Sequence, residues 1–139
     1  LGVAVDVGST TIAAHLCDLT SGEVLGSRGA MNPQIPFGAD LMSRVSHVML
    51  NPGSESDMTR VVREAVDGLI GDLTQDSGAA RGDMLEIVLV ANPIMHHLFL
   101  GISPVELGQA PFPLATDGAV EVRAAQLGRW RAAETFTRC

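Results

Sequence analysis

The chain has 139 residues, 46% of them hydrophobic, and a formal net charge of −7. This length suits one domain of about 100–150 residues, and the acidic balance argues against a nucleic-acid partner or an anionic membrane surface. No signal peptide precedes Leu1, and no apolar run approaches the roughly 20 residues that span a bilayer. We therefore expect no membrane partner and a cytoplasmic location.

The first thirty residues predict three antiparallel strands. Residues 1–7 form an apolar run typical of a buried strand, and residues 11–17 its antiparallel partner. A second turn at residues 18–23 leads to a third strand at residues 24–30.

The turn between the first two strands combines an acid, a glycine and hydroxyl side chains. Gly8 lets the backbone turn closely, and Ser9, Thr10 and Thr11 offer amides and hydroxyls that can surround an anionic oxygen. Asp6 would repel a bare phosphate, so we expect it to hold a hydrated magnesium ion between the two. The alternative is ordinary turn chemistry, in which Asp and Ser side chains bond their own backbone.

Two helices are expected next. Residues 31–38 predict a loop, because two prolines and a glycine prevent regular structure. A helix should run from Ala39 to about Asn51, with an apolar face of Leu41, Val45, Val48 and Met49. A second should begin at 54–56 and end near Gly78, with a stripe of Met58, Val61, Val62, Ala65, Leu69, Ile70 and Leu73.

Residues 85–91 predict a central strand buried on both faces, because they are almost all apolar. Asn92 follows it, at the strand end where ligands of α/β sheets usually lie. Its alternative role is the N-cap of a short helix that starts at Pro93 and ends at Gly101. His96 and His97 point about 100° apart on that helix and lack a third ligand, so we interpret them as structural.

The C-terminal part carries weaker signals. Residues 103–113 predict a proline-rich connection with room for a helical turn, and residues 119–125 a weak final strand or helix. The last dozen residues show no periodicity, so we expect an irregular tail at 129–139, for which a non-native continuation stays an open alternative. Cys17 and Cys139 lack metal-site spacing, and Cys17 is expected to be a small core residue.

Three antiparallel strands with this turn resemble the actin, sugar kinase and heat-shock ATPase superfamily. Three longer stretches, AVDVGSTTIAAHLCDLTSGEVL, NPQIPFGADLMSRV and VLVANPIMHHLFLGISPVELGQAPF, resemble the ATPase domain of the reductive activators of corrinoid proteins. The resemblance covers about residues 1–112, and NPQIPFGAD is its most specific motif, since neither packing nor turn chemistry demands so long a fixed string.

The resemblance implies a ribonuclease H-like α/β fold. Residues 1–128 would form the first lobe of an actin-like ATPase, truncated before the second lobe, with a mixed sheet of three antiparallel strands and a parallel central strand flanked by helices. It places Asp6, Gly8, Ser9, Thr10 and Thr11 in the first phosphate loop. It places the loop that holds Asn32, Gln34 and Asp40, and also Asn92, beside the nucleotide cleft. Relatives have Gly-Asn-Thr-Thr-Met where this chain has ANPIM, which removes a hydroxyl.

The resemblance also implies a function for the parent protein. It would couple ATP and magnesium to the reduction of cob(II)alamin to cob(I)alamin on a corrinoid protein. The electrons would come from an iron–sulfur donor, a [2Fe–2S] module outside this chain, and the missing second lobe would be a further partner. A homodimer stays an open alternative. Alone, the chain is expected to bind nucleotide weakly and to catalyse nothing. Competing hypotheses are a sugar-type kinase and a noncatalytic actin-like assembly protein.

Overall fold

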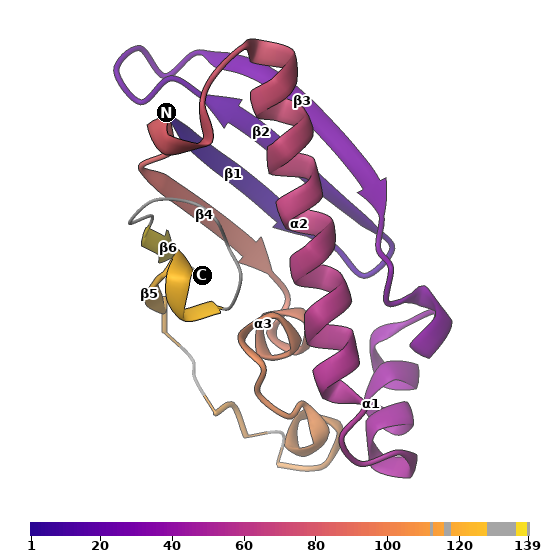
Figure 1. The fold of residues 1–139 in the computed structure, drawn as a ribbon. Helices are drawn as coiled ribbons and strands as arrows, with labels where there is room; N and C mark the ends of the chain where they lie inside the picture. The colour runs from indigo at the N-terminus through magenta and orange to yellow at the C-terminus, as the bar shows by residue number, and fades with distance from the viewer. Residues whose placement is uncertain (112, 116–117, 128–135, 139) are drawn as a thin grey trace.

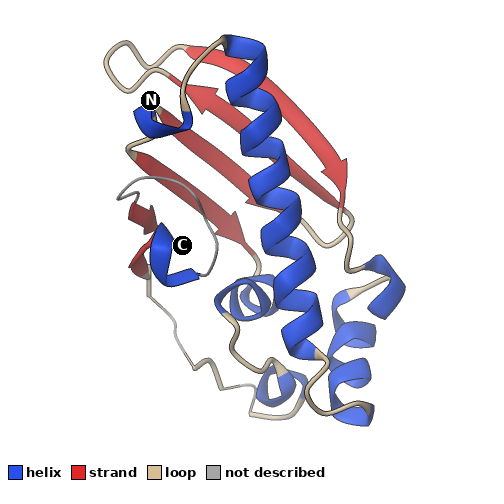
Figure 2. Cartoon of the chain, in the orientation of Figure 1, coloured by secondary structure: helices blue, strands red, loops and turns tan. Residues whose placement is uncertain are grey.

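The computed structural model describes residues 1–111, 113–115, 118–127 and 136–138. Within these residues six strands form one mixed sheet in the order β3-β2-β1-β4-β6-β5 (Figures 1 and 2). Their bounds are β1 Gly2–Val7, β2 Thr11–Cys17, β3 Val24–Met31, β4 Glu86–Ala91, β5 Glu121–Arg123 and β6 Phe136–Arg138. The expected mixed α/β architecture is confirmed.

Strand β1 lies at the centre of the sheet. It pairs antiparallel with β2 and parallel with β4, so that Val7 lies opposite both Ile12 and Ala91. Strand β2 pairs antiparallel with β3, which completes the expected three-stranded start. Because β1 and β4 run in the same direction, their carboxyl ends meet at one edge of the sheet.

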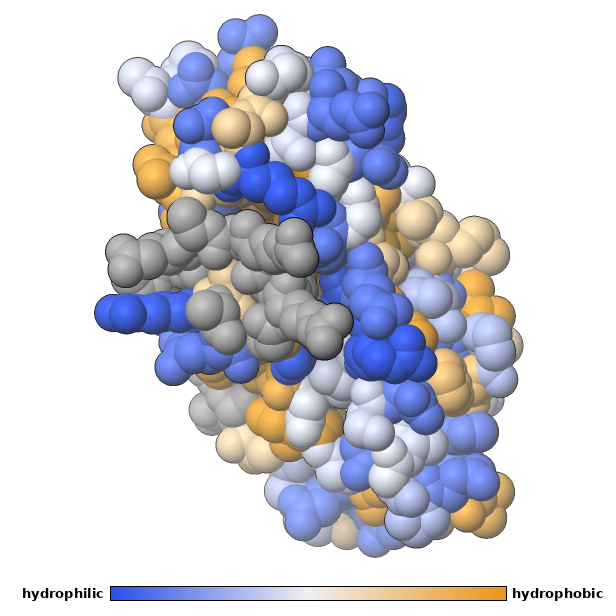
Figure 3. Space-filling view, viewed as in Figure 1, coloured by the Kyte–Doolittle hydropathy of each residue, from blue (hydrophilic) through white to orange (hydrophobic). Residues whose placement is uncertain are grey.

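The longest helix, α2, crosses one face of the sheet (Figure 1). The helices are α1 Leu41–Leu50, α2 Glu55–Ser77 and α3 Pro93–Leu100. Gly78 and Gly101 end α2 and α3 with φ of 70° and 81°, the left-handed conformation that glycine adopts without strain. Short 3₁₀ segments are η1 Ile35–Phe37, η2 Arg81–Asp83, η3 Val105–Gly108 and η4 Ala124–Leu127. Hydrophilic residues follow the outer surface of α2 in the same view (Figure 3).

The core lies between the sheet and these helices. Alternate residues of the three central strands are buried there, namely Val3, Val5, Val7, Ile12, Ala14, Leu16, Ile87 and Leu89. Helix α2 contributes Met58, Val62, Val66, Leu69, Ile70 and Leu73, and α3 contributes Ile94, Met95, Leu98 and Phe99. This alternation is the period of a strand with one face on a core.

The opposite face of the sheet is open over its central strands, which corrects one expectation. Val88 is 36% exposed and Val90 58% exposed, so β4 is buried on one face and not on both. Ala4, Asp6 and His15 are exposed as well. An apolar composition alone did not distinguish a strand covered on both faces from one covered on a single face.

Helix α1 also differs from expectation. Met49 is 46% exposed, and Arg44 takes a buried position beside Val45 and Val48. Positions 41, 44, 45 and 48 lie on one helix face, so the charged residue occupies the apolar stripe.

The C-terminal part adds two strands to the sheet. The weak element expected at 119–125 is β5 followed by η4. Strand β6 pairs parallel with β4, so the expectation of an irregular tail is wrong for residues 136–138. Such pairing depends on a distant strand and leaves no local signal. Residues 128–135 and 139, with the boundary expected at 128, lie outside the described residues.

No helix in the described ranges combines the length and the hydrophobicity needed to cross a bilayer.

Met58→Ala should lower the free energy of unfolding by about 2–5 kcal/mol, because the side chain is fully buried in the hydrophobic core. Met49→Ala is the matched control, since Met49 is 46% exposed, and its effect should stay below about 0.5 kcal/mol. Chemical denaturation followed by circular dichroism measures both. Equal effects would contradict the assignment of α2 to the core and of Met49 to the surface.

Candidate functional site

Two of the predicted site residues, Gly8 and Asn92, lie at the carboxyl ends of β1 and β4. Val7 and Ala91 are paired in register, so Gly8 and Asn92 each stand one residue beyond the last pair. Crevices at such strand ends are the usual ligand sites of α/β sheets. Gly8 is the first residue of the turn that leads into β2, and Asn92 is the residue immediately before α3.

Gly8 is required at this turn by a close backbone approach. Its N–H donates to the Thr11 carbonyl at 3.0 Å. A Cβ atom at this position would lie 2.6 Å from the same oxygen, well inside van der Waals contact. Any other residue would therefore open the turn.

All three carbonyl oxygens of the turn accept hydrogen bonds from the protein interior. Asn32 donates twice, from Nδ2 to the Gly8 oxygen and from its backbone N–H to the Thr10 oxygen, both at 2.7 Å. Arg44 Nη2 donates to the Ser9 oxygen. A trans peptide holds its N–H opposite its C=O, so the three following amides point away from the interior.

These outward amides belong to Ser9, Thr10 and Thr11. Among the described residues, no acceptor takes the N–H of Ser9 or Thr10. Ser9 is half-buried, and Thr10 and Thr11 are exposed. Successive outward N–H groups form a concavity of partial positive charge, the kind of backbone site that binds anions.

Asp6 lies on the open face of the sheet. It pairs with Ala13 of β2 and Val90 of β4, and it is exposed, whereas Val5 and Val7 on either side are buried. Thr11 lies on the same face, diagonal to Asp6 across the β1–β2 pair.

The described residues could bind a magnesium ion through a single carboxylate. Across the described residues no group of three or more His, Cys, Asp or Glu side chains is placed to hold a metal. Magnesium does not need such a cage, because it commonly binds through one or two carboxylates, substrate phosphates and retained water. Asp6 could supply the single carboxylate.

The loop of residues 32–40 is built into the fold. Asn32 and Gln34 are 1% and 0% exposed. Asn32 Oδ1 accepts from the Gln34 backbone N–H at 2.9 Å, and Gln34 Nε2 donates to the Met58 carbonyl at 2.9 Å. Both side chains therefore lie behind the turn and support it, rather than facing solvent.

The end of this loop has equally specific packing. A Cβ atom on Gly38 would lie 2.7 Å from the Arg44 backbone nitrogen. Asp40 caps α1 by accepting from the Ser43 N–H at 2.8 Å, and this hydrogen bond holds the pKa of the exposed Asp40 carboxyl below its usual value. We expected that neither packing nor turn chemistry would explain the motif NPQIPFGAD. The structure corrects this expectation, because hydrogen bonds and close packing account for several of its residues.

Arg44 is the residue of this region that the sequence analysis missed. Besides Ser9, its guanidinium bonds the Gly38 carbonyl at 2.9 Å, Gln34 Oε1 at 3.2 Å and Met95 Sδ at 3.1 Å. It therefore joins the turn, the 32–40 loop and α3. A charged residue at position 44 of the stripe 41, 44, 45 and 48 was the available signal.

Asn92 acts as a helix cap in the structure. Its Oδ1 accepts from the Met95 N–H at 3.0 Å. Of its two expected roles this is the one with a visible partner, and the half-buried side chain lies at the same edge as the turn.

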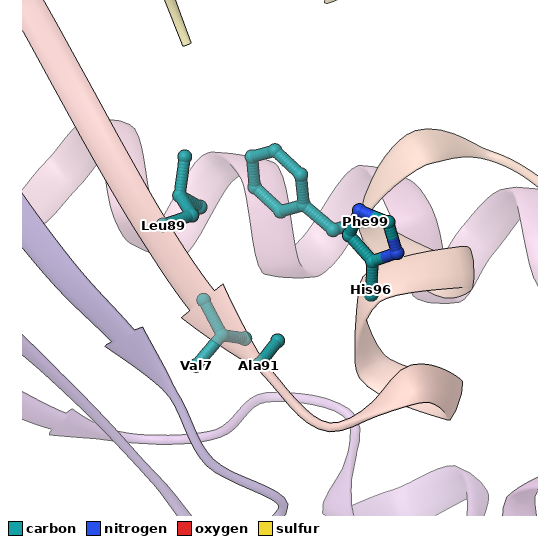
Figure 4. A pocket seen from close by; sticks show the side chains of 5 residues that line it. All are labelled: Val7, Leu89, Ala91, His96 and Phe99. Atoms are coloured by element: carbon teal, nitrogen blue, oxygen red, sulfur yellow. The ribbon is translucent and has the colours of Figure 1, made fainter. Parts of the chain in front are cut away.

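The two adjacent histidines have different surroundings. His97 is 1% exposed, its Nδ1 lies 2.7 Å from the Pro93 carbonyl, and its Nε2 accepts from the Ala115 N–H. This is a structural arrangement. His96 lines a small apolar pocket with Val7, Leu89, Ala91 and Phe99 (Figure 4).

The His96 ring is poorly suited to carry charge. Its Nε2 is buried and has no partner among the described residues. Burial in the first place, and then the neighbouring His97, lower the pKa of His96.

Asn32→Ala should lower the free energy of unfolding by about 1–3 kcal/mol, because it leaves the Gly8 carbonyl without its side-chain donor. Asn51→Ala is the control, since the exposed Asn51 side chain donates to the His47 carbonyl in the preceding helix turn and supports no distant segment that the structure describes. Its effect should stay below about 1 kcal/mol. Chemical denaturation measures the difference, and equal losses would show that the turn does not depend on Asn32.

Acidification should destabilise the protein partly through His96. Its folded pKa lies below the unfolded value of about 6.5, so the unfolded state binds the proton first and stability falls as the pH drops below about 6.5. His96→Leu should flatten this part of the stability curve between about pH 8 and pH 5.5. A parallel loss in wild type and His96→Leu would contradict the assignment.

Comparisons with known proteins agree with one another. The sequence model of the family described as RACo middle region matches residues 1–136, beyond residue 112 where the motif resemblance ended. The Corrinoid activation enzyme RamQ of Eubacterium limosum is 33% identical over 111 residues, covering 80% of this chain and 19% of that protein. The solved structure of a Reductive activator for corrinoid,iron-sulfur protein has a TM-score of 0.92 at 32% identity, covering 98% of this chain and 22% of the other. The chain thus spans about a fifth of the length of each relative. It belongs to the RACo middle region family.

Proposed function

We propose that this chain contributes a phosphate-binding element to an ATP-dependent reductive activator of a corrinoid protein. The observation that carries the proposal is the turn after β1, whose carbonyls are all bonded from within, so that its amides point outward. One relative is named a corrinoid activation enzyme, and the other a reductive activator for a corrinoid, iron-sulfur protein. A corrinoid protein is therefore the proposed partner.

In this proposal the outward amides and the hydroxyls of Ser9, Thr10 and Thr11 bind nucleotide phosphate oxygens. Asp6 holds magnesium on the open face of the sheet, partly through water, and the ion would neutralise phosphate charge that Asp6 alone would repel. Asn32, Gln34 and Arg44 keep the turn in shape without touching the nucleotide. Asp40 and Asn92 fix the starts of α1 and α3 near the same edge.

We further propose that the chain is the first lobe of an actin-like ATPase. The support is a sheet whose first hairpin carries the phosphate turn, with β1 also pairing parallel to β4. A second lobe would supply the rest of the nucleotide site. Nucleotide can drive a change between the lobes only by binding one arrangement more tightly than the other.

An iron–sulfur cluster does not fit this chain. A [2Fe–2S] centre needs four protein ligands, usually cysteine thiolates, and the sequence has two cysteines. Cys17, the cysteine within the described residues, is a free thiol. In the proposed activator the electron donor is therefore a separate module.

The test is calorimetric binding of magnesium–ATP to the full-length protein that carries this chain. Asp6→Asn should weaken binding by about tenfold or more, because a neutral amide is a poor magnesium ligand. Asp72→Asn, which removes the same charge at an exposed position of α2, should bind like the wild type.

The second readout is the absorbance change from cob(II)alamin to cob(I)alamin on a corrinoid protein, with an electron donor and ATP. Wild type should show ATP-dependent reduction, and Asp6→Asn should lose it. If Asp6→Asn binds magnesium–ATP as tightly as the wild type, the hairpin has an ordinary turn and not a magnesium-dependent phosphate site. ATP turnover stimulated by a sugar would favour a kinase, and ATP-dependent sedimentation an assembly protein.

A further inference from the structure

Arg44 is a fully buried cation without an acidic partner. Its side chain is 0% exposed, yet no carboxylate of the described residues lies within ion-pair distance of it. Its four acceptors are the carbonyls of Ser9 and Gly38, the Gln34 amide oxygen and the Met95 sulfur. All of them are neutral.

A buried, unpaired charge is expensive. Arginine is almost never fully buried unless it is paired, because a buried charge loses its hydration and regains only part of that free energy from neutral acceptors. Burial lowers the pKa of the Arg44 guanidinium, opposed by the charge of Asp40. Asp40, however, is exposed and uses its carboxylate to cap α1. The four acceptors explain why a hydrogen-bond donor stands here, but they do not require that the donor carry a full charge.

The position of the charge supplies a reason. Arg44 Nη2 bonds the Ser9 carbonyl, and the N–H of the same peptide, on Thr10, points the opposite way, toward solvent. The guanidinium thus lies directly behind the outward amides of the turn. Its positive charge and the amide dipoles both attract an anion to the outer side of the turn.

We propose that Arg44 is a positioning residue whose buried charge raises the affinity of the turn for nucleotide phosphates without contact between the two. This inference rests on the proposed function and adds a residue to it. It predicts that charge at position 44 matters to anion binding even when the shape of the turn is preserved. A residue that only held the turn would show no such dependence.

The experiment compares three variants in the full-length protein. Arg44→Lys keeps the charge, with fewer hydrogen bonds, when its buried amine is protonated, so this variant is measured at about pH 6 as well as about pH 7.5. Arg44→Met and Arg44→Gln remove the charge. Arg60→Met is the matched control, because Arg60 is an exposed arginine of α2 whose side chain pairs with Asp57 and Glu64 on the same helix. The probe is inorganic tripolyphosphate with magnesium, measured by calorimetry at low and high salt.

The neutral variants should bind the probe at least about tenfold more weakly than wild type, and Arg44→Lys should stay within about threefold of it. The affinity gap between wild type and Arg44→Gln should narrow at high salt, because screening weakens a charge effect. Arg60→Met should match the wild type. Thermal unfolding with and without the probe gives a second readout, in which the stabilising shift should be smaller in the neutral variants.

Other outcomes overturn the inference. Equal binding by wild type and a folded neutral variant would show that the charge is irrelevant. Equal losses in Lys, Met and Gln, without dependence on salt, would leave Arg44 a scaffold residue only. If Arg44→Met does not fold, Arg44→Gln decides. A wild-type protein that binds no tripolyphosphate refutes the proposed function itself, which separates that failure from failure of the Arg44 inference.

Discussion

The geometry of the candidate site depends on hydrogen bonds that hold the turn after β1 by its carbonyl oxygens. Asn32 donates hydrogen bonds to the Gly8 and Thr10 oxygens, and Arg44 donates one to the Ser9 oxygen. Peptide planarity then fixes where the amides point, although no acceptor within the described part of the chain bonds the N–H of Ser9 or Thr10. The arrangement is dictated from the interior, because buried carbonyls need donors. The same donors tie the turn to α1 and to the loop before it, so a change in either element would alter the orientation of the amides.

The one-sided sheet explains how an acid can stand close to this turn. Strand alternation buries Val5 and Val7 under the helices and places Asp6 on the open face. An exposed carboxylate keeps its hydration and needs no buried partner. The two charges thus have different surroundings: Asp6 is exposed on the open face of β1, whereas Arg44 is buried and bonded to the Ser9 carbonyl of the turn. Within the proposed function, the acid would face the metal and the arginine would lie behind the phosphates.

Arg44 also connects the elements through which a nucleotide signal would have to pass. Its guanidinium contacts the turn, the Gly38 carbonyl and Met95 in the first half of α3. In the proposed activator, binding of a phosphate would change the electrostatic surroundings of a group bonded to three segments at once. Such a group is suited to relay the occupancy of the turn to the helices, provided that nucleotide favours one of their arrangements. The matched region is about a fifth of each relative, and in the proposed activator the remaining parts are what the helices would act on.

The sequence by itself determined the local features of the protein. Two apolar runs on either side of a turn predicted β1 and β2, and the 3.6-residue period predicted α2. Gly78 and Gly101 marked helix ends. Each of these signals arises among neighbours in the chain. The motifs also indicated the family, and the residue types of the turn indicated a candidate phosphate site. The tertiary structure decided the rest. Periodicity could not show that β4 is covered on one face, nor that β6 pairs with it.

The supporting role of the 32–40 loop was hidden for the same reason. Asn32 bonds a carbonyl 24 residues away, and Arg44 contacts a sulfur 51 residues away. Such contacts follow no local spacing rule, because they form only when the chain brings distant segments together. The sequence therefore indicated which residues could bind phosphate, whereas only the fold showed that Asn32 and Arg44 orient the amides of the turn.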